Sequence, residues 1–146
     1  MQVHVVAVGK VKERGVREAV DDYLGRIGRY ARVRVAELKD GDDAEVTARF
    51  FKAIPDRSRV VALEVEGKAL SSQGLAELVG RCEGEGVQSL VFLIGGSYGL
   101  PAAVRARADV ELSLSRMTLP HRLARLLLAE QVYRAFTILR NEPYSH

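Results

Sequence analysis

The chain has 146 residues, 47% of them hydrophobic, and a formal net charge of +3. This length is sufficient for one domain with a buried core and short for two, so we expect a single domain over residues 1–146. No apolar run reaches the roughly 18 residues of a transmembrane helix, and the amino end lacks the pattern of a secretory signal, so we expect a cytoplasmic protein without a membrane span.

In the first half of the chain, strand and helix patterns alternate twice. A β-branched apolar run at residues 3–8 predicts a strand, and apolar residues at helical spacing over residues 16–30 predict the helix that follows it. Residues 32–38 alternate as a second strand. The acidic turn at residues 40–43 can cap a short helix, which Pro55 ends. His4 lies within the first strand, and we interpret it as structural.

The second half of the chain continues the alternation. A strand at residues 60–65 is followed by a turn at Glu66-Gly67-Lys68 and by a helix that Ser71 or Ser72 caps. Cys82, near the end of that helix, is the only cysteine, and its apolar neighbours favour a buried residue over a reactive thiol. The remaining predicted elements are a strand at 90–94, a short helix opened by Pro101, a strand at 110–114 and a helix at 122–140.

Strands that alternate with helices, several of them apolar throughout, predict an α/β fold with a mostly parallel sheet covered by helices on both faces. Ligands of such folds bind beyond the carboxyl ends of the strands. This rule selects the loops at Gly67, at Gly95-Gly96 and at residues 115–120. The glycine spacing after the fourth strand is G-G-x-x-G, which matches neither the dinucleotide fingerprint nor a P-loop. A glycine pair after a strand is often only a turn, so its value rests on the companion loops.

Charge is distributed unevenly along the chain. Residues 1–34 hold eight Lys or Arg against four acids, residues 35–114 hold nine against 13, and residues 115–146 hold five against two. A fold that brought the two basic ends together would create a surface suited to a phosphate backbone. Solvated helix faces are the alternative, and composition alone favours them. The basic residues concerned are Lys10, Lys12, Arg14, Arg17, Arg116, Arg122 and Arg125.

The predicted helix at residues 122–140 has more apolar residues than one buried face requires. A stripe from Leu128 to Leu139 is enough to face a sheet. The surplus indicates either a second copy of the chain as a burial partner or a helix wedged between core elements, and the pattern favours neither. The apolar residues outside the stripe are Leu126, Leu127, Tyr133 and Ile138.

Four ordered motifs cover much of the chain: VALEVEGK at residues 61–68, FLIGGSYGL at 92–100, LSLSRMTLPH at 112–121 and EQVYRA at 130–135. Together they resemble the ribosomal large subunit methyltransferase H family, and the likeness extends from residues 6–10 to Pro143-Tyr144. The resemblance implies a SPOUT-class enzyme, a homodimer with a trefoil knot at the carboxyl end of the sheet and no metal. It implies S-adenosylmethionine as methyl donor. The implied acceptor is N3 of pseudouridine 1915 in helix 69 of 23S rRNA, within the assembled 70S ribosome.

The resemblance also implies which residues form the site. Leucine and methionine side chains would enclose the adenine, while a glycine lets the backbone approach the adenosine closely. The N3 proton of the base must leave, and His121, Tyr144 and His146 are the candidates to bind the base or accept that proton. A capping role for His121 and a frayed end at Tyr144 are the alternatives. The residues that the resemblance places around the cofactor are Leu63, Gly95, Leu114, Ser115, Arg116, Met117, Thr118 and Leu119.

Two departures from the family pattern concern the carboxyl end and the middle of the chain. Members usually end in Pro-Tyr-His and a basic residue, whereas this chain ends in Tyr144-Ser145-His146, so the histidine is displaced by one position. The chain is also shorter than usual around residues 40–51. Two other functions stay open: an enzyme of the same fold that acts on another RNA, and a non-catalytic ribosome-binding module.

Overall fold

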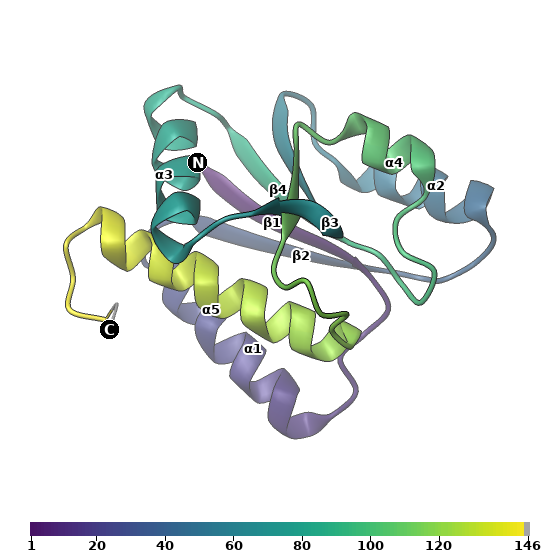
Figure 1. Ribbon diagram of the computed structural model, residues 1–146, viewed down its shortest axis with the longest axis horizontal. Coiled ribbons are helices and arrows are strands. Elements are labelled where there is room, and N and C mark those ends of the chain that lie inside the picture. Colours follow the sequence, from purple (N-terminus) through teal and green to yellow (C-terminus); the bar gives the residue numbers. More distant parts are fainter. Residues whose placement is uncertain (145–146) are drawn as a thin grey trace.

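Five strands form one sheet in the order β2-β1-β4-β3-β5, and each strand is parallel to its neighbours (Figure 1). The structure, a computed structural model, describes residues 1–144. The elements are β1 (Gln2–Val8), α1 (Arg14–Ile27), β2 (Arg32–Leu38), α2 (Asp43–Ala53), β3 (Ser58–Ala69), α3 (Ser72–Gly84), β4 (Ser89–Ile94), α4 (Ala102–Arg107), β5 (Val110–Ser113) and α5 (His121–Leu139). Within residues 1–144, no helix combines the length and the apolar character needed to cross a bilayer.

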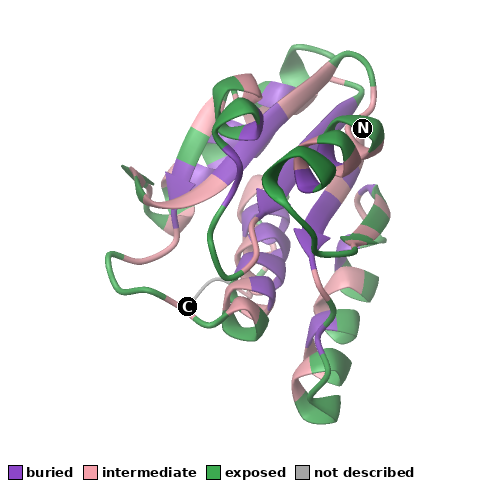
Figure 2. Cartoon of the chain, turned by 90° about the vertical axis from the view of Figure 1, so that its right-hand side faces the viewer, coloured by how far each residue is buried: buried purple, intermediate pink, exposed green. Residues whose placement is uncertain are grey.

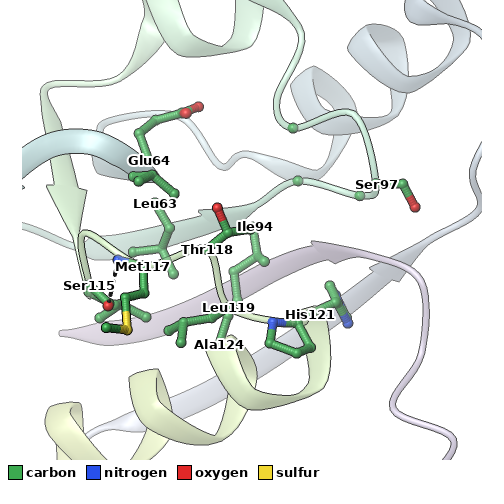
Figure 3. A pocket seen from close by; sticks show the side chains of 16 residues that line it. Leu63, Glu64, Ile94, Ser97, Ser115, Met117, Thr118, Leu119, His121 and Ala124 are labelled. Atoms are coloured by element: carbon green, nitrogen blue, oxygen red, sulfur yellow. Dashed lines mark hydrogen bonds between the residues drawn. The ribbon is translucent and has the colours of Figure 1, made fainter.

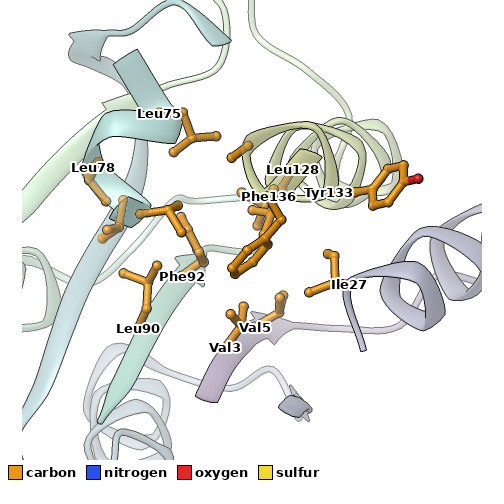
Figure 4. Close-up of a cluster of buried hydrophobic side chains, with 14 of the residues drawn as sticks. Val3, Val5, Ile27, Leu75, Leu78, Leu90, Phe92, Leu128, Tyr133 and Phe136 are labelled. Carbon is orange, nitrogen blue, oxygen red and sulfur yellow. The ribbon is translucent and has the colours of Figure 1, made fainter. Parts of the chain in front are cut away.

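Helices cover both faces of the sheet, as predicted. Helices α1, α3 and α5 pack on one face, where Phe92 of β4 and Val5 of β1 meet Phe136 of α5 (Figure 4). Helices α2 and α4 cover the other face, where Phe50 of α2 lies in a second apolar cluster with Leu93 of β4. Figure 2 shows the same division, with buried strands inside and exposed residues on the outer sides of the helices. The α/β class with a parallel sheet is therefore confirmed.

Side-chain caps begin two of the helices. Asp42 accepts a hydrogen bond from the Glu45 backbone N at 2.8 Å, and the Glu45 side chain accepts one from the Asp42 backbone N at 3.0 Å, which forms a capping box for α2. Ser71, rather than Ser72, caps α3 by accepting from the Gly74 backbone N at 3.0 Å. The Ser72 hydroxyl instead donates to Gln131 of α5 at 2.6 Å and so ties the two helices together.

Strand β3 differs from its prediction near its carboxyl end. The predicted turn at Glu66-Gly67-Lys68 is wrong, because the strand continues to Ala69. Leu63 and Lys68 both pair with Leu112 of β5, so the residues between them form a bulge without partners on that strand. The bulge, residues 64–67, lies at the sheet edge where a ligand is expected.

Helix α5 is wedged between α1, α3 and the sheet. Tyr133, one of the surplus apolar residues, is buried within the chain, with its ring centroid 6.1 Å from that of Tyr23 and 6.4 Å from that of Tyr30. Leu127 is 40% exposed, and Leu123, one turn earlier, is 37% exposed. Packing inside the chain thus accounts for Tyr133 and leaves Leu123 and Leu127 as an exposed apolar pair.

We expect Gly67→Ala to lower the free energy of unfolding by about 1–3 kcal/mol. The added methyl group would lie 2.8 Å from the backbone carbonyl of Glu111, so one of the two strands has to move. Gly25→Ala is the matched control, because Gly25 lies in α1 with open space at its Cβ position. Alanine there should stabilise the protein by about 0.5–1 kcal/mol. Urea denaturation measures both, and an unchanged stability of Gly67→Ala would show that this contact does not hold the bulge.

Candidate active site

A cavity of about 420 Å³ lies beyond the carboxyl ends of β3 and β4 (Figure 3). Three segments line it: residues 63–65 of β3, the glycine loop (residues 95–99) after β4, and the entry loop (residues 114–120) that leads into α5. The volume is in the range of small-molecule sites. Of the three loops that the strand-end rule selects, those at Gly95-Gly96 and at residues 115–120 line the cavity, whereas Gly67 does not, because β3 continues through it.

Seven of the eight residues predicted to surround a cofactor line this cavity. The exception, Arg116, is exposed and lies outside the lining. Apolar side chains from strand and loop gather on one side of the cavity, so it offers an apolar wall to a flat ring (Figure 3). The seven lining residues are Leu63, Gly95, Leu114, Ser115, Met117, Thr118 and Leu119.

The entry loop is held by its own hydrogen bonds. The Ser115 hydroxyl accepts from the Met117 backbone N at 2.9 Å, and the Ser113 hydroxyl donates to the Ser115 carbonyl at 3.0 Å. Such side-chain bonds to the backbone stabilise a turn without a regular ladder. The loop thus presents its backbone to the cavity in a fixed conformation.

Gly95 is required by its own loop. A Cβ at this position would lie 2.6 Å from the Leu100 backbone N and 2.7 Å from the Gly99 carbonyl O. The structure thus gives a different reason for this glycine than the close approach of an adenosine, because the Cβ direction is filled by the loop backbone. A bulky residue at Gly95 would distort the glycine loop before it reached a ligand.

Within residues 1–144, two buried side-chain atoms lack a hydrogen-bond partner, and both belong to residues that line this cavity. They are Oε1 of Glu64 and Nε2 of His121, which lie on opposite sides of the cavity (Figure 3). Buried polar groups nearly always have partners in folded proteins. Both residues are candidates to bind a ligand of this cavity, and Arg105 Nε lies 3.2 Å from Glu64 Oε1.

His121 is the first residue of α5, and it follows Pro120 at a helix start that has no side-chain cap. Burial lowers the pKa of the His121 imidazole, Arg125 lowers it further, and Glu37 opposes them. Arg125 is only 5% exposed and donates to Glu37 of β2 at 3.0 Å. The imidazole is therefore neutral at neutral pH, and Arg125 belongs to the interior rather than to the predicted basic surface.

Tyr144 lies away from His121 within the same chain. Its hydroxyl donates to Glu130 of α5 at 2.7 Å, and its ring centroid lies 4.7 Å from that of Tyr133. Glu130 is about 14 Å along the axis of α5 from His121, and Tyr144 does not line the cavity. Burial and the hydrogen bond to Glu130 raise the pKa of Tyr144. His146 lies outside the described residues.

The two basic ends of the chain meet at the start of α5. Arg122 Nε lies 3.9 Å from Glu13 Oε1, which brings the segment before α1 next to the helix that follows the entry loop. One of the arginines, Arg14, pairs with Glu18 at 3.0 Å. The exposed basic residues of this region are Lys10, Lys12, Arg14, Arg17, Arg116 and Arg122.

Glu64 is the site residue that sequence analysis missed. The signal was present, because Glu64 is a charged residue inside the apolar run Val61-Ala62-Leu63-Glu64-Val65 that precedes a glycine. An acidic side chain within a predicted strand suggests either an outward-facing position or a polar site. Only the structure shows that its side chain is 17% exposed and borders the cavity.

Comparison with known proteins bears on this cavity directly. A family model described as "Predicted SPOUT methyltransferase" matches residues 1–146. The chain belongs to the SPOUT methyltransferase family. The resemblance found in the sequence motifs is thereby confirmed, and the parallel sheet agrees with it, whereas the trefoil knot stays a prediction.

Relatives of this SPOUT methyltransferase match it over their full length. A "Ribosomal RNA large subunit methyltransferase H" from Sorangium cellulosum (strain So ce56) is 50% identical over 146 residues, with 100% of both chains covered. A protein of the same name from Geotalea daltonii is 43% identical over 153 residues, again with 100% of both covered. The solved structure of "a probable methylase family protein from Haemophilus influenzae Rd KW20" shares the fold, with a TM-score of 0.58 and 14% identity over 95% of this chain and 68% of that one.

In this SPOUT methyltransferase, we expect the His121 imidazole to titrate below the ordinary value of 6.5, because burial disfavours its charged form. An NMR titration of the histidine ring signals measures it. His121→Gln assigns the signal among the three histidines of the chain. A value at or above 6.5 would show that the imidazole is better solvated or better paired than the structure indicates.

Proposed function

We propose that this chain uses S-adenosylmethionine to methylate N3 of a pseudouridine in helix 69 of 23S rRNA, within the assembled 70S ribosome in the cytoplasm. The observation that carries the proposal is the cavity between the glycine loop and the entry loop, with its two unpartnered polar atoms, in a SPOUT chain. The names of the full-length relatives, which act on large-subunit rRNA, support the choice of substrate. The resemblance supports the trefoil knot as part of this proposal.

The residues around the cavity fit an adenosyl cofactor. Leu63, Leu114 and Leu119 provide an apolar wall for the adenine, and the ordered backbone of the entry loop provides N–H and C=O groups for its edge. The cofactor, when bound, supplies an activated methyl group and its own leaving group. The protein therefore has to hold the methyl group in line with N3 and to remove the N3 proton.

His121 is positioned to handle that proton. His121 lines the cavity, its Nε2 is buried without a hydrogen-bond partner in the described chain, and burial lowers the pKa of the imidazole. A neutral imidazole can accept the proton that N3 loses as the bond to the methyl carbon forms. Arg125 and Glu37 hold the first turns of α5 against β2 and so keep His121 at the cavity.

Tyr144 can share a site with His121 only if two copies of the chain contribute. The tail is fixed on the carboxyl-terminal half of its own α5, where Tyr144 donates to Glu130 and Glu142 accepts from Tyr30 at 2.6 Å. The exposed pair Leu123 and Leu127 gives α5 an apolar patch close to the cavity. A homodimer that buries this patch would bring the tail of one copy toward the cavity of the other.

The basic ends offer a surface for the RNA backbone. Arg116 lies exposed in the entry loop, and Lys10 and Lys12 lie exposed in the segment that Glu13 brings to the start of α5. The described residues form one sheet with its covering helices, and this single layered arrangement offers little surface for sequence readout. The assembled ribosome would therefore supply part of the specificity through its shape.

The proposed function predicts that ribosomes lacking the modification gain one methyl group at the helix 69 pseudouridine when incubated with this protein and S-adenosylmethionine. Mass spectrometry of nuclease fragments measures the position. His121→Ala should reduce the turnover rate by about 100-fold and leave cofactor affinity within a factor of about two. Methylation at a different nucleotide would favour an enzyme acting on another RNA. Absence of any methyl transfer, with tight ribosome binding, would favour a non-catalytic module.

The shared site predicts complementation between two inactive variants. His121→Ala has an intact tail, and a chain lacking residues 144–146 has an intact His121. In a mixed dimer, one of the two sites combines the cavity of the shortened chain, which keeps His121, with the intact tail of the His121→Ala chain. When the two variants are dissociated, mixed and allowed to pair at random, about half of the dimers are mixed. Each mixed dimer has one working site out of two, so the mixture should recover up to about a quarter of the wild-type rate.

Each variant mixed only with itself is the control, and it should stay inactive. Failure of the mixture to recover activity, when native mass spectrometry shows mixed dimers, would mean that each cavity uses the tail of its own chain. Full activity of the shortened chain by itself would show that the tail takes no part.

A further inference from the structure

Glu64 combines a shared ion pair with an unused capacity for hydrogen bonds. Arg105 of α4 lies beside it, with Nε 3.2 Å from Glu64 Oε1, yet that oxygen has no hydrogen-bond partner. The hydrogen bonds of Arg105 go instead to Glu111, at 3.2 and 3.1 Å. An ionised carboxylate can accept several hydrogen bonds, so Glu64 is left with an acceptor that needs a donor.

The bulge fixes Glu64 before any ligand arrives. Glu64 is the first of the β3 residues that have no partner on β5. Gly67, at the other end of the bulge, lies against the backbone of Glu111, whose side chain shares Arg105 with Glu64. Arg105 thus holds the carboxylate, and the bulge holds the backbone that carries it, on the side of the cavity opposite His121 (Figure 3). A group fixed in this way binds a ligand with little loss of side-chain entropy.

The chemistry of this position selects among the donors of an adenosyl compound. Arg105 already places a cation beside Glu64 but shares it with Glu111, so the probes below have to separate a neutral donor from the ammonium of the amino-acid portion. The adenine edge mixes donors with acceptors, which an acceptor-only carboxylate matches poorly and which the entry-loop backbone can match. A vicinal diol offers two neutral O–H donors, and a carboxylate on ribose hydroxyls is a recurrent contact in nucleotide-binding folds.

We propose that Glu64 accepts hydrogen bonds from the ribose hydroxyls of the nucleoside bound in this cavity. This inference rests on the proposed function, because the ribose is that of the adenosyl cofactor. Glu64 is then a specificity residue that fixes the ribose at one side of the cavity, while the side near His121 is left for the methyl acceptor. Burial and the nearby Glu111 raise the pKa of the Glu64 carboxyl, and Arg105 offsets this only in part. Donors from a diol favour the ionised form.

Three probes separate the parts of the ligand. All three probes carry the adenine. S-adenosylhomocysteine has the ribose diol and the amino-acid portion, and 5′-methylthioadenosine has the diol without the amino-acid portion. The 2′,3′-dideoxy form of methylthioadenosine has neither. Glu64→Gln keeps the size of the side chain and removes its charge. The matched control is Glu66→Gln, because Glu66 is exposed on the same bulge and does not line the cavity.

Isothermal titration calorimetry should show that Glu64→Gln weakens S-adenosylhomocysteine and methylthioadenosine by about tenfold each and leaves the dideoxy compound unchanged. Glu66→Gln should leave all three affinities unchanged. The wild-type protein should itself bind the dideoxy compound at least about tenfold more weakly than methylthioadenosine. That comparison needs no variant and holds even if Glu64→Gln folds poorly.

Three results would overturn the inference while leaving the proposed function intact. A loss confined to S-adenosylhomocysteine would place the contact on the ammonium group. An equal loss for the dideoxy compound would place it on the adenine. Equal wild-type affinity for methylthioadenosine and its dideoxy form would show that the diol is not recognised. Binding of none of the three probes by the wild-type protein would overturn the proposed function and this inference together.

Discussion

The parallel register of β4 between β1 and β3 is the constraint on which the whole site depends. All six residues of β4 are buried, and the strand pairs with β1 as far as Ile94 and with β3 as far as Leu93. The last pair of β3 and β4 is Ala62 with Leu93, so the glycine loop starts beside the segment of β3 in which the bulge begins at Glu64. A shift of the β4 register by one residue would turn each of its apolar side chains to the other face of the sheet. The packing of the core therefore fixes the register of β4, and the register fixes where the glycine loop lies at the cavity.

Elements whose apolar residues repeat at a local period were predictable from the sequence. The strand predicted at residues 32–38 has the observed bounds of β2, and those of β1 and β4 differ by one residue. The bulge was not predictable in this way. Glu66-Gly67-Lys68 has the composition of a turn, but Lys68 pairs with Leu112, far along the chain, so Glu66 and Gly67 lie in a bulge of the strand. Local patterns carry no information about that partner.

The site likewise has a part that the sequence predicts and a part that it does not. Seven of the eight residues that the resemblance places around a cofactor line the cavity, because glycine, serine and leucine at fixed spacing describe how the loops fold. The motif resemblance did not predict which charged groups are buried, because burial depends on neighbours from distant segments of the chain. From the sequence, Arg125 is expected on the surface and Glu64 is expected to face outward. The structure instead pairs Arg125 with Glu37 of β2 and Glu64 with Arg105 of α4. Composition rules place such residues outside by default.

Helix α5 separates two tasks that the proposed reaction needs in one place. Its first residue, His121, borders the cavity, whereas its second half holds the tail through Glu130. Every helix of the described chain packs on the sheet or on a neighbouring helix, which leaves no separate element to cover the cavity. A second copy can provide that cover. A tail already ordered by the bonds at Tyr144 and Glu142 would lose little conformational entropy when it docks against another copy, which favours assembly of a shared site over closure of a flexible lid.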